Sequence, residues 1–536
     1  MSQAGQKNSA WTISRRTVLR AAGAVGVVGA GAGATVLGAA TNSAAAPAAS
    51  AFAHPGLLHT QADFDRMAAK VKAGAEPYME GFNKLVRNGR AQSSWRARPL
   101  ERVVRGGDGD NVAQFYLDVH AAYQNALRWK VTGDTAHADT ARDILNTWSE
   151  TLTALDGNAD RFLAAGIHGY QFANAAEIMR GYEGFDLARF QKMMLTIFYP
   201  MNNSFLTNHN GAFITNYWPN WDLVNIASVL AIGILCDDRA KVDQAVTYFK
   251  TGEGNGSLKN AISVIHPGGL GQWIEAGRDQ GHALLGIGIA ATICEMAWNQ
   301  GIDLYGYDDN RFLKGAEYVA KWNLGESVPY SPYVYRKGAP GIWSGTDTFT
   351  EASGAGRGQV RPIWEGIHNH YVKRRGLAAP YVTAINAQVR PEGGGGDYGT
   401  GGGGFDHLGF GTLAFTRDAA PAATRTEPPR RAESEPTAAA APGVAAGAGA
   451  GAGAGESAAS GAGTASGSGS GSGTGASAAP TAPTASPDSG VKPQGGAGQD
   501  LAATGSTGIA AALVTAGAAL TGGFLLISRR RAGRGA

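Results

Sequence analysis

The feature that most restricts the fold is a series of stretches with helical periodicity, which runs from about residue 54 to residue 417 with short turns between them. The first two predicted helices, Val112–Val131 and Ala136–Leu152, flank the turn Thr132-Gly133-Asp134. Connections this short join antiparallel neighbours, so the stretches pair as helical hairpins. Further helices are predicted at Gly169–Arg180, Leu187–Ile197, Leu223–Leu235, Lys241–Thr251, His282–Trp298, Phe312–Trp322 and Ile363–Arg374.

Strands are rare in this pattern, and the clearest candidate is Gly411–Thr416. A ring of helical hairpins requires inner helices that are apolar on every side, together with loops rich in aromatic residues and Gly at its mouth. We therefore predict an all-α fold, namely an α/α toroid in the form of an incomplete barrel of antiparallel helical hairpins with few short strands.

The N-terminal segment predicts export. Residues 14–19 read SRRTVL, a weakly hydrophobic Ala/Gly run follows, and Ala51-Phe52-Ala53 provides a small-x-small cleavage site. This order is typical of a signal for the twin-arginine translocase, which is removed on maturation. The alternative is an Ala-rich leader without structure.

The C-terminal part predicts a stalk and an anchor. From about residue 418 to residue 500, Ala, Gly, Ser, Pro and Thr dominate, and such a segment cannot bury a core. Residues 501–505 (LAATG) resemble a sortase sorting signal, followed by the hydrophobic run Gly508–Ile527 and by Arg529–Arg531. The resemblance implies cleavage after Thr504 and attachment to the peptidoglycan of a Gram-positive, actinobacterial-type cell wall. A plain membrane anchor is the alternative, and both place the protein at the cell surface.

These features predict a signal peptide at 1–53, a toroid domain at 54–417, a disordered stalk at 418–500, and a sorting signal with a transmembrane segment and basic tail at 501–536. The formal net charge of +3 becomes −5 when the eight basic residues of the two processed ends are removed, because those ends contain no acid. A mildly acidic protein is a poor partner for nucleic acid, so any site for a polyanion must be a local basic groove.

The two cysteines, Cys236 and Cys294, both lie in apolar helical stretches. Two buried thiols and one disulfide between neighbouring helices are both compatible with this placement. Neither cysteine has a metal-ligand spacing, and no metal or cofactor is expected.

The chemistry is expected in Gly268–Trp298, a Gly-rich loop followed by a helix whose second half is apolar on every side. At about 100° per residue, Glu275, Arg278 and His282 fall within roughly 60° of one another on a helix. An acid, a guanidinium and an imidazole beside a core usually have a partner or a function. The alternative is a rim ion pair with a core histidine.

Aromatic residues gather in the predicted loops. The run Asn216–Asp222 (NYWPNWD) opens a helix, and Tyr330–Arg336 (YSPYVYR) lies in a long loop that leads to Trp343. Flat rings with hydrogen-bonding groups between them suit the faces of sugars, and packing within the loops is the alternative.

Several motifs, in order along the chain, resemble those of the alginate lyase superfamily of secreted polysaccharide lyases. They are residues 54–59 (HPGLLH), 220–222 (NWD), 275–282 (EAGRDQGH), 361–365 (RPIWE) and 369–371 (NHY). The resemblance covers about residues 54–417. It implies an α/α toroid that cleaves a 4-linked uronic acid polymer, of the alginate or glucuronan type, by β-elimination.

Such an elimination sets three requirements. The proton on C5 is too weakly acidic to leave while the neighbouring carboxylate is charged, so the site must neutralise that carboxylate. A base then takes the C5 proton, and an acid gives a proton to the leaving O4. On this resemblance, Asn220 and Arg278 bind the carboxylate, and His282 is the base or neutraliser. Tyr335, or less favourably Tyr333, is the acid or serves as both acid and base.

Other residues of the same stretches are expected to contact the acidic polysaccharide: Tyr217, Trp221, Glu275, Gln280, Tyr333, Arg361, Glu365 and His370. Alternatives remain, because Asn220 near a helix start also suits an N-cap, and the spacing of Arg361, Glu365 and His370 also suits a solvated helix face. His266 is a loop histidine and a weaker candidate than His282.

The chain departs from the better-known alginate lyases in two places. They carry an Asn-Asn-His run before a Tyr-Trp pair, whereas here Ile214-Thr215-Asn216 precede Tyr217-Trp218. They also place a Tyr seven residues after the Arg, where this chain has Leu285. The base is therefore not inherited in that arrangement, and alginate and glucuronan stay equally open as substrates.

Two other functions stay open. α/α toroids also host glycoside hydrolases, for which Asp222, Glu275 and Asp279 offer a carboxylate pair. The third hypothesis is a wall-displayed glycan-binding protein without activity.

Overall fold

The computed structural model describes residues 52–399 and 404–421, which all belong to the unit Ser50–Ala536. Most of the predicted signal peptide, nearly all of the stalk, Thr504 and the hydrophobic run Gly508–Ile527 lie outside the described residues. Those predictions therefore stay predictions.

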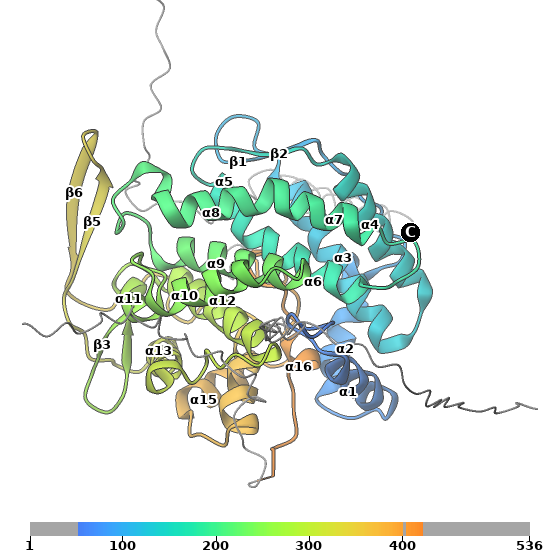
Figure 1. The fold of residues 1–536 in the computed structure, drawn as a ribbon. Helices are drawn as coiled ribbons and strands as arrows, with labels where there is room; N and C mark the ends of the chain where they lie inside the picture. The colour runs from blue at the N-terminus through green and yellow to red at the C-terminus, as the bar shows by residue number, and fades with distance from the viewer. Residues whose placement is uncertain (1–51, 400–403, 422–536) are drawn as a thin grey trace, which may run out of the picture. The chain divides into compact units, whose positions relative to one another are not determined.

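The described residues are mostly helical, as predicted (Figure 1). The α-helices are α1 (Gln61–Lys72), α2 (Tyr78–Arg87), α3 (Val112–Thr132), α4 (Thr135–Thr151), α5 (Arg161–Leu163), α6 (Gly169–Met179), α7 (Leu187–Met193), α8 (Tyr199–Asn208), α9 (Pro219–Leu235), α10 (Arg239–Thr251), α11 (Leu258–Ala261), α12 (Gln280–Asn299), α13 (Tyr307–Asn323), α14 (Trp364–His368), α15 (Pro380–Val389) and α16 (Gly411–Ala414). The 3-10 and π turns are η1 (Gly89–Ala91), η2 (Ala164–His168), η3 (Met194–Phe198), η4 (His209–Gly211), η5 (Ile274–Gly277) and η6 (Asn369–Arg374). The strands are β1 (Arg102–Arg105), β2 (Ala154–Gly157), β3 (Ile262–Ile265), β4 (Gly271–Trp273), β5 (Tyr333–Ala339) and β6 (Trp343–Phe349).

Local sequence signals explain where the helices begin and end. The Thr60 side chain caps α1 in a capping box with Asp63. Helix α3 ends at Gly133, whose φ of 76° is easily reached only by glycine, and α4 begins after Asp134, whose carboxylate accepts from the Ala136 N–H. The turn predicted at 132–134 therefore joins an antiparallel pair.

The helices form two layers. In the inner layer α3 contacts α6, α6 contacts α9, and α9 contacts α12, while α4, α8, α10 and α13 pack against them from outside. The inner row continues through α14 and α16 to α1, which contacts α3 again, so the contacts run around a ring. Figure 1 shows α6, α9 and α12 side by side. The predicted α/α toroid is confirmed.

The inner helices are buried on all sides. Every residue of α9 is buried, and α12 is buried over most of its length. Helix α12 is long and apolar enough to cross a membrane by composition, but most of it lies inside the protein core. It is therefore the central helix that the apolar pattern of Gly268–Trp298 predicts.

Three predictions about local structure are wrong. Gly411–Thr416 is not a strand, because residues 411–414 form α16, and Leu413 packs against Gly81 of α2. A short apolar run fits a buried helix turn as well as a strand. The predicted loop after Tyr330 contains the antiparallel hairpin β5–β6 instead. Glu275, Arg278 and His282 are not on one continuous helix, because Asp279 is extended between η5 and α12.

The two cysteines do not pair. Cys236 and Cys294 are free thiols, so the disulfide alternative is excluded. Burial raises the pKa of the Cys236 thiol to about 12, which leaves it protonated and inert.

Candidate active site

The side chains of Glu275, Arg278 and His282 meet although the backbone between them is not one helix. The Arg278 guanidinium places Nη1 3.1 Å from Oε1 of Glu275 and Nη2 3.3 Å from Nε2 of His282. Arg278 and His282 keep 17% and 21% of their side chains exposed, whereas Glu275 is fully buried. A guanidinium and an imidazole are therefore presented to solvent above a buried acid.

Asp279 orients both of these groups. One of its oxygens caps α12 by accepting from the His282 N–H at 2.8 Å, and the other accepts from Nδ1 of His282 at 2.7 Å. Since a carboxylate only accepts, Nδ1 carries the proton and Nε2 is the bare acceptor that faces Arg278. Burial opposes ionisation of Asp279, but the hydrogen bonds from His282 and the charge of Arg278 lower the pKa of Asp279 below its usual value.

An aromatic platform supports Arg278. Its guanidinium carbon lies 5.3 Å from the Trp218 ring centroid, and Trp218 stacks on Tyr335 at 4.2 Å between centroids with an interplanar angle of 13°. Trp218 is the N-cap of α9, and Tyr335 comes from β5. The hairpin β5–β6 thus reaches the start of α9.

The hairpin presents two tyrosines that differ in freedom. Tyr335 is buried, and its hydroxyl donates to the backbone carbonyl of Asn216. Tyr333 lies on the same face of β5 and is half-buried, and its hydroxyl makes no hydrogen bond within residues 52–399 and 404–421. Burial raises the pKa of Tyr333 to about 12, so this hydroxyl keeps its proton at neutral pH.

Asn220 lies in the first turn of α9, one residue after Pro219, so it is not the N-cap. Its side chain is buried, and its Oδ1 has no hydrogen-bond partner. No hydrogen bond joins Asn220 to Arg278 in the described part of the chain. The link between them is Trp218, which precedes α9 and lies against the Arg278 guanidinium. The structure therefore places Arg278 and Tyr335 against Trp218 and His282 against Arg278, while Asn220 follows Trp218 by two residues.

Glu275 differs from the acids that surround it. Burial raises its pKa above the usual value, although the nearby charge of Arg278 acts in the opposite direction. Its second oxygen accepts from the Trp273 indole at 3.4 Å. Glu275 therefore supports Arg278 from below and has no exposed oxygen for a ligand.

The remaining predicted contacts fall into two groups. Tyr217 and Trp221 pack on each other and on Phe205, with the Tyr217 hydroxyl accepting from Asn210 at 3.1 Å. Gln280 is fully buried, donates to the carbonyls of Ala276 and Ser353, and accepts from Asn323. Tyr217 lies near the platform, whereas Gln280 ties the start of α12 to its neighbours.

Arg361, Glu365 and His370 are all buried, so none of them lies on a solvated helix face. Arg361 pairs with Asp406 at 3.0 Å, and Glu365 pairs with Arg390. His370 stacks on Tyr305 at 3.6 Å between centroids, and its Nδ1 lies 2.7 Å from Arg374. None of the three contacts Arg278 or His282.

One buried polar group had no counterpart in the predictions. His209 contacts Oδ1 of Asp222 at 2.9 Å and the Tyr248 hydroxyl at 3.2 Å, and the Gly256 N–H donates to the other Asp222 oxygen at 2.8 Å. His209 is thirteen residues before Asp222 and has a φ of 45°, so no helical spacing connects them. The carboxylate of Asp222 is fully engaged and is not available to a substrate.

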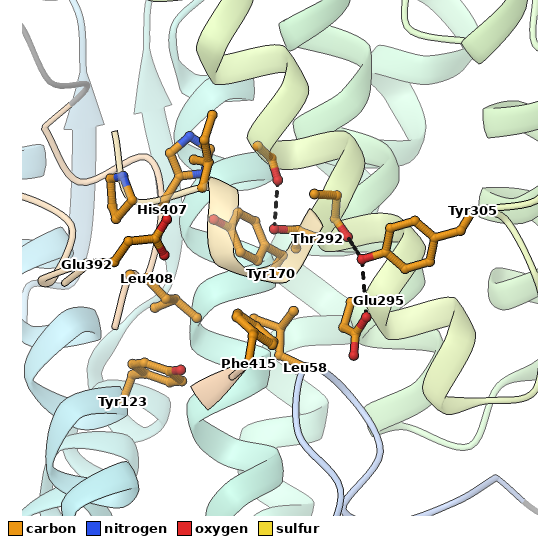
Figure 2. Close-up of a pocket in the computed structure, with 16 residues that line it drawn as sticks. Leu58, Tyr123, Tyr170, Thr292, Glu295, Tyr305, Glu392, His407, Leu408 and Phe415 are labelled. Carbon is orange, nitrogen blue, oxygen red and sulfur yellow. Dashed lines mark hydrogen bonds between the residues drawn. The ribbon is translucent and has the colours of Figure 1, made fainter. Parts of the chain in front are cut away.

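The interior of the ring holds a small cavity, which Figure 2 shows with Tyr305 donating to Glu295 at 3.1 Å. The space amounts to about 50 Å³ and is lined by Tyr123, Tyr170, Thr292 and His407 among others. A few water molecules fill such a volume, whereas ligand pockets usually measure about 300–1,000 Å³. A sugar ring therefore does not fit there, and the exposed Arg278 and His282 are the better site.

Comparison with known proteins finds one matching family. The family model described as alginate lyase matches residues 87–328, which include Trp218, Asn220, Arg278 and His282. This match places residues 87–328, the greater part of the toroid domain, in the alginate lyase superfamily. The match supports assignment of this protein as a polysaccharide lyase, built on the toroid described above.

Solved structures of similar proteins include two alginate lyases. Alginate lyase A1-III of Sphingomonas species A1 shares 15% identity with this lyase at a TM-score of 0.41, over 66% of this chain and 95% of the other. An alginate lyase of Bacteroides ovatus shares 13% identity at a TM-score of 0.40, over 63% of this chain and 96% of the other. No curated protein matches the sequence.

Proposed function

We propose that this lyase cleaves a 4-linked uronic acid polymer, of the alginate or glucuronan type, by β-elimination. The observation that carries the proposal is the pair of Arg278 and His282, in which a partly exposed guanidinium lies 3.3 Å from an unprotonated imidazole nitrogen. The first group suits a uronate carboxylate, and the second suits the neighbouring C5–H.

Substrate binding activates the base in this proposal. In the free protein, Nη2 of Arg278 donates to Nε2 of His282 and occupies its lone pair. A uronate carboxylate competes for that N–H, because a charged acceptor binds a guanidinium more strongly than an imidazole does. Asn220, in the first turn of α9, is the proposed second donor, and the positive ends of α9 and α12 favour the same negative charge.

The elimination then follows with balanced bonds. Nε2 of His282 takes the C5 proton, the C5–H electrons form the C4–C5 double bond, and the C4–O4 bond breaks. The leaving O4 takes a proton from a tyrosine of β5, and Asp279 stabilises the imidazolium until its proton passes to solvent while the tyrosinate regains a proton from solvent. Of the two candidates we propose Tyr333 as the acid, because the Tyr335 hydroxyl already donates to Asn216. Tyr335 then holds Trp218 beneath Arg278.

The carboxylates do not support hydrolysis. Asp222 is engaged with His209, Glu275 with Arg278, and Asp279 with His282, so each already accepts from a basic group. An inverting or retaining hydrolase needs one free carboxylic acid and one free carboxylate across the scissile bond. These three carboxylates do not provide that pair.

We also propose that the lyase acts outside the cell. The twin-arginine signal, the stalk and the LAATG signal support export and attachment to the cell wall. A large acidic polymer is accessible only there, so location and substrate class agree.

The test is an absorbance assay on the full chain. The conjugated double bond of an unsaturated uronate absorbs in the ultraviolet, so absorbance should rise with alginate or with glucuronan and stay flat with a neutral 4-linked glucan. Arg278→Ala should abolish the rise. New reducing ends without absorbance would indicate hydrolysis instead, and saturable binding without new ends would indicate a glycan-binding protein; either result overturns the proposal.

A further inference from the structure

A second group of polar side chains without partners lies on the rim, away from Arg278. Arg105 ends β1, and its guanidinium makes no hydrogen bond or ion pair within the described residues. The carboxylate of Asp160, just before α5, likewise has no hydrogen bond or ion pair there. The two groups are close in the fold, because Arg105 lies opposite Gly157 in the β1–β2 pair, three residues before Asp160. A half-exposed cation and anion that do not pair are free to bind a third molecule.

Two aromatic rings lie beside them. Tyr116 of α3 stacks on Phe405 at 4.3 Å between centroids, and the Arg90 guanidinium carbon lies 5.0 Å from the Phe405 centroid. Strand β1, which ends at Arg105, packs against α3, the helix that carries Tyr116. Aromatic rings flanked by free hydrogen-bonding groups are the usual composition of a sugar-binding surface.

His168 supplies a buried polar atom at the same place. Its ring centroid lies 5.8 Å from that of Tyr116, the residue is only 2% exposed, and its Nε2 has no hydrogen-bond partner among the residues that the structure describes. Gln171 donates through Nε2 to the Phe405 carbonyl, so its Oε1 faces Nδ1 of His168 at 3.1 Å and accepts from it. Burial lowers the pKa of His168 to about 3, which keeps the ring neutral. Nε2 is therefore an acceptor that lacks a donor, a need that a ligand hydroxyl or a water held by the ligand fills.

This region is connected to the candidate active site along the rim. Arg161, next to Asp160, donates to Asn210 at 3.4 Å, and Asn210 donates to the Tyr217 hydroxyl at 3.1 Å. Tyr217 precedes Trp218, on which Arg278 lies. A polymer chain that places one sugar at Arg278 can thus continue over Tyr217 towards Arg105.

We propose that Arg105, Asp160, Tyr116 and Phe405 form a second sugar-binding subsite for the acidic polymer, which we call the outer subsite. Arg105 binds the carboxylate of a uronate unit, Asp160 accepts from its hydroxyls, and the Tyr116–Phe405 stack supports its ring. The identity of the ligand rests on the proposed function, whereas the existence of the subsite rests on the unpartnered groups.

The test compares Arg105→Ala with Arg102→Ala on the full chain. Arg102 belongs to the same strand but pairs with Asp156, so it is a matched control. With the polymer that the wild type cleaves, Arg105→Ala should raise KM about tenfold, which corresponds to losing one charge-assisted contact, and leave kcat within about twofold. With the shortest oligomer that is cleaved, the effect should vanish. Asp160→Asn should act in the same direction but more weakly, and Arg102→Ala should match the wild type.

An unchanged KM for the polymer in Arg105→Ala overturns the outer subsite and leaves the proposed function intact. If the wild type cleaves no uronate polymer, the proposed function fails, and calorimetric titration with oligoglucuronate and oligomannuronate decides the subsite separately. Binding that weakens in Arg105→Ala but not in Arg102→Ala supports it, and equal or absent binding in all three proteins overturns it. Arg105→Gln provides a second variant should the alanine variant fold poorly.

Discussion

Two parts of the protein contain the same three residue types in the same contacts. Near the mouth, Arg278 contacts Glu275 and His282, and in the interior Arg374 contacts Glu295 and His370. The difference lies in the histidine. His282 is partly exposed and anchored by Asp279, whereas His370 is buried and stacked flat on Tyr305. Solvent access and the partner of the second ring nitrogen therefore separate a candidate catalytic group from a structural one.

The two glutamates show the same difference through their pKa values. Burial raises the pKa of Glu275 above its usual value, with Arg278 as the nearest opposing charge. Burial acts on Glu295 too, but Arg374 and Arg417 outweigh it and lower the pKa of Glu295. The interior acid is therefore committed to an ion-pair network, whereas burial opposes ionisation of the acid at the mouth, and the arginine paired with that acid keeps part of its side chain exposed to solvent.

Substitution of each histidine is the most direct test of the difference between the two clusters. His282→Ala should lower kcat by about 10²–10⁴-fold, the usual contribution of a general base, with little change in melting temperature. His370→Ala should instead lower the free energy of unfolding by about 2 kcal/mol and leave the activity of the folded fraction unchanged. Absorbance kinetics and urea unfolding measure the two effects. Equal loss of activity in both variants would contradict the distinction.

The arginines give the next largest effect, this time on stability. Arg374→Ala leaves Glu295 buried without its main partner and should cost about 3–5 kcal/mol of unfolding free energy. Arg278→Ala should cost only about 1 kcal/mol, because Arg278 is partly exposed and burial raises the pKa of Glu275, which makes it easier for Glu275 to take up a proton once its partner is removed. Urea unfolding of both variants at neutral pH measures the two losses of unfolding free energy. Comparable losses would contradict the distinction between the two clusters.

The same pair predicts a pH dependence. Since the folded pKa of Glu295 is depressed, its stabilisation is present above its unfolded value of 4.5 and is lost as the pH falls through the folded pKa. Wild-type stability should therefore fall on acidification below about pH 4.5, and Arg374→Ala should show less of this fall. Unfolding curves between pH 7 and pH 3 provide the measurement.

The contrast between the clusters also explains what the sequence was able to predict. Glu275, Arg278 and His282 are three and four residues apart, and side chains at these separations meet in a tight turn as well as in a helix. Their contact was therefore predictable although Asp279 interrupts the helix. The apolar residues of α9 and α12 likewise predicted inner helices, because burial on all sides leaves no polar face.

Long-range partners were not predictable from one sequence. Trp218 and Tyr335 are far apart in the chain, and they meet only because β5–β6 folds as a hairpin. The sequence predicts a loop there because the outward residues of the hairpin, such as Arg336 and Thr346, are polar. Its turn contains Pro340, which also favours a loop. The engagement of Glu365 by Arg390 likewise depends on how α14 and α15 pack, which residue spacing does not encode.

The smallest effect concerns Asp279, which both caps α12 and anchors His282. Asn caps helices about as well as Asp, so Asp279→Asn keeps the cap and removes the negative charge beside the imidazole. We expect kcat to fall about tenfold with KM nearly unchanged, because the anchor stabilises the imidazolium that forms only during proton transfer. Asp238→Asn is the control, since Asp238 caps α10 in the same way and contacts no proposed catalytic group. A drop in melting temperature shared by both variants, with unchanged kcat in Asp279→Asn, would show that Asp279 is only a helix cap and that the mouth cluster is organised like the interior one.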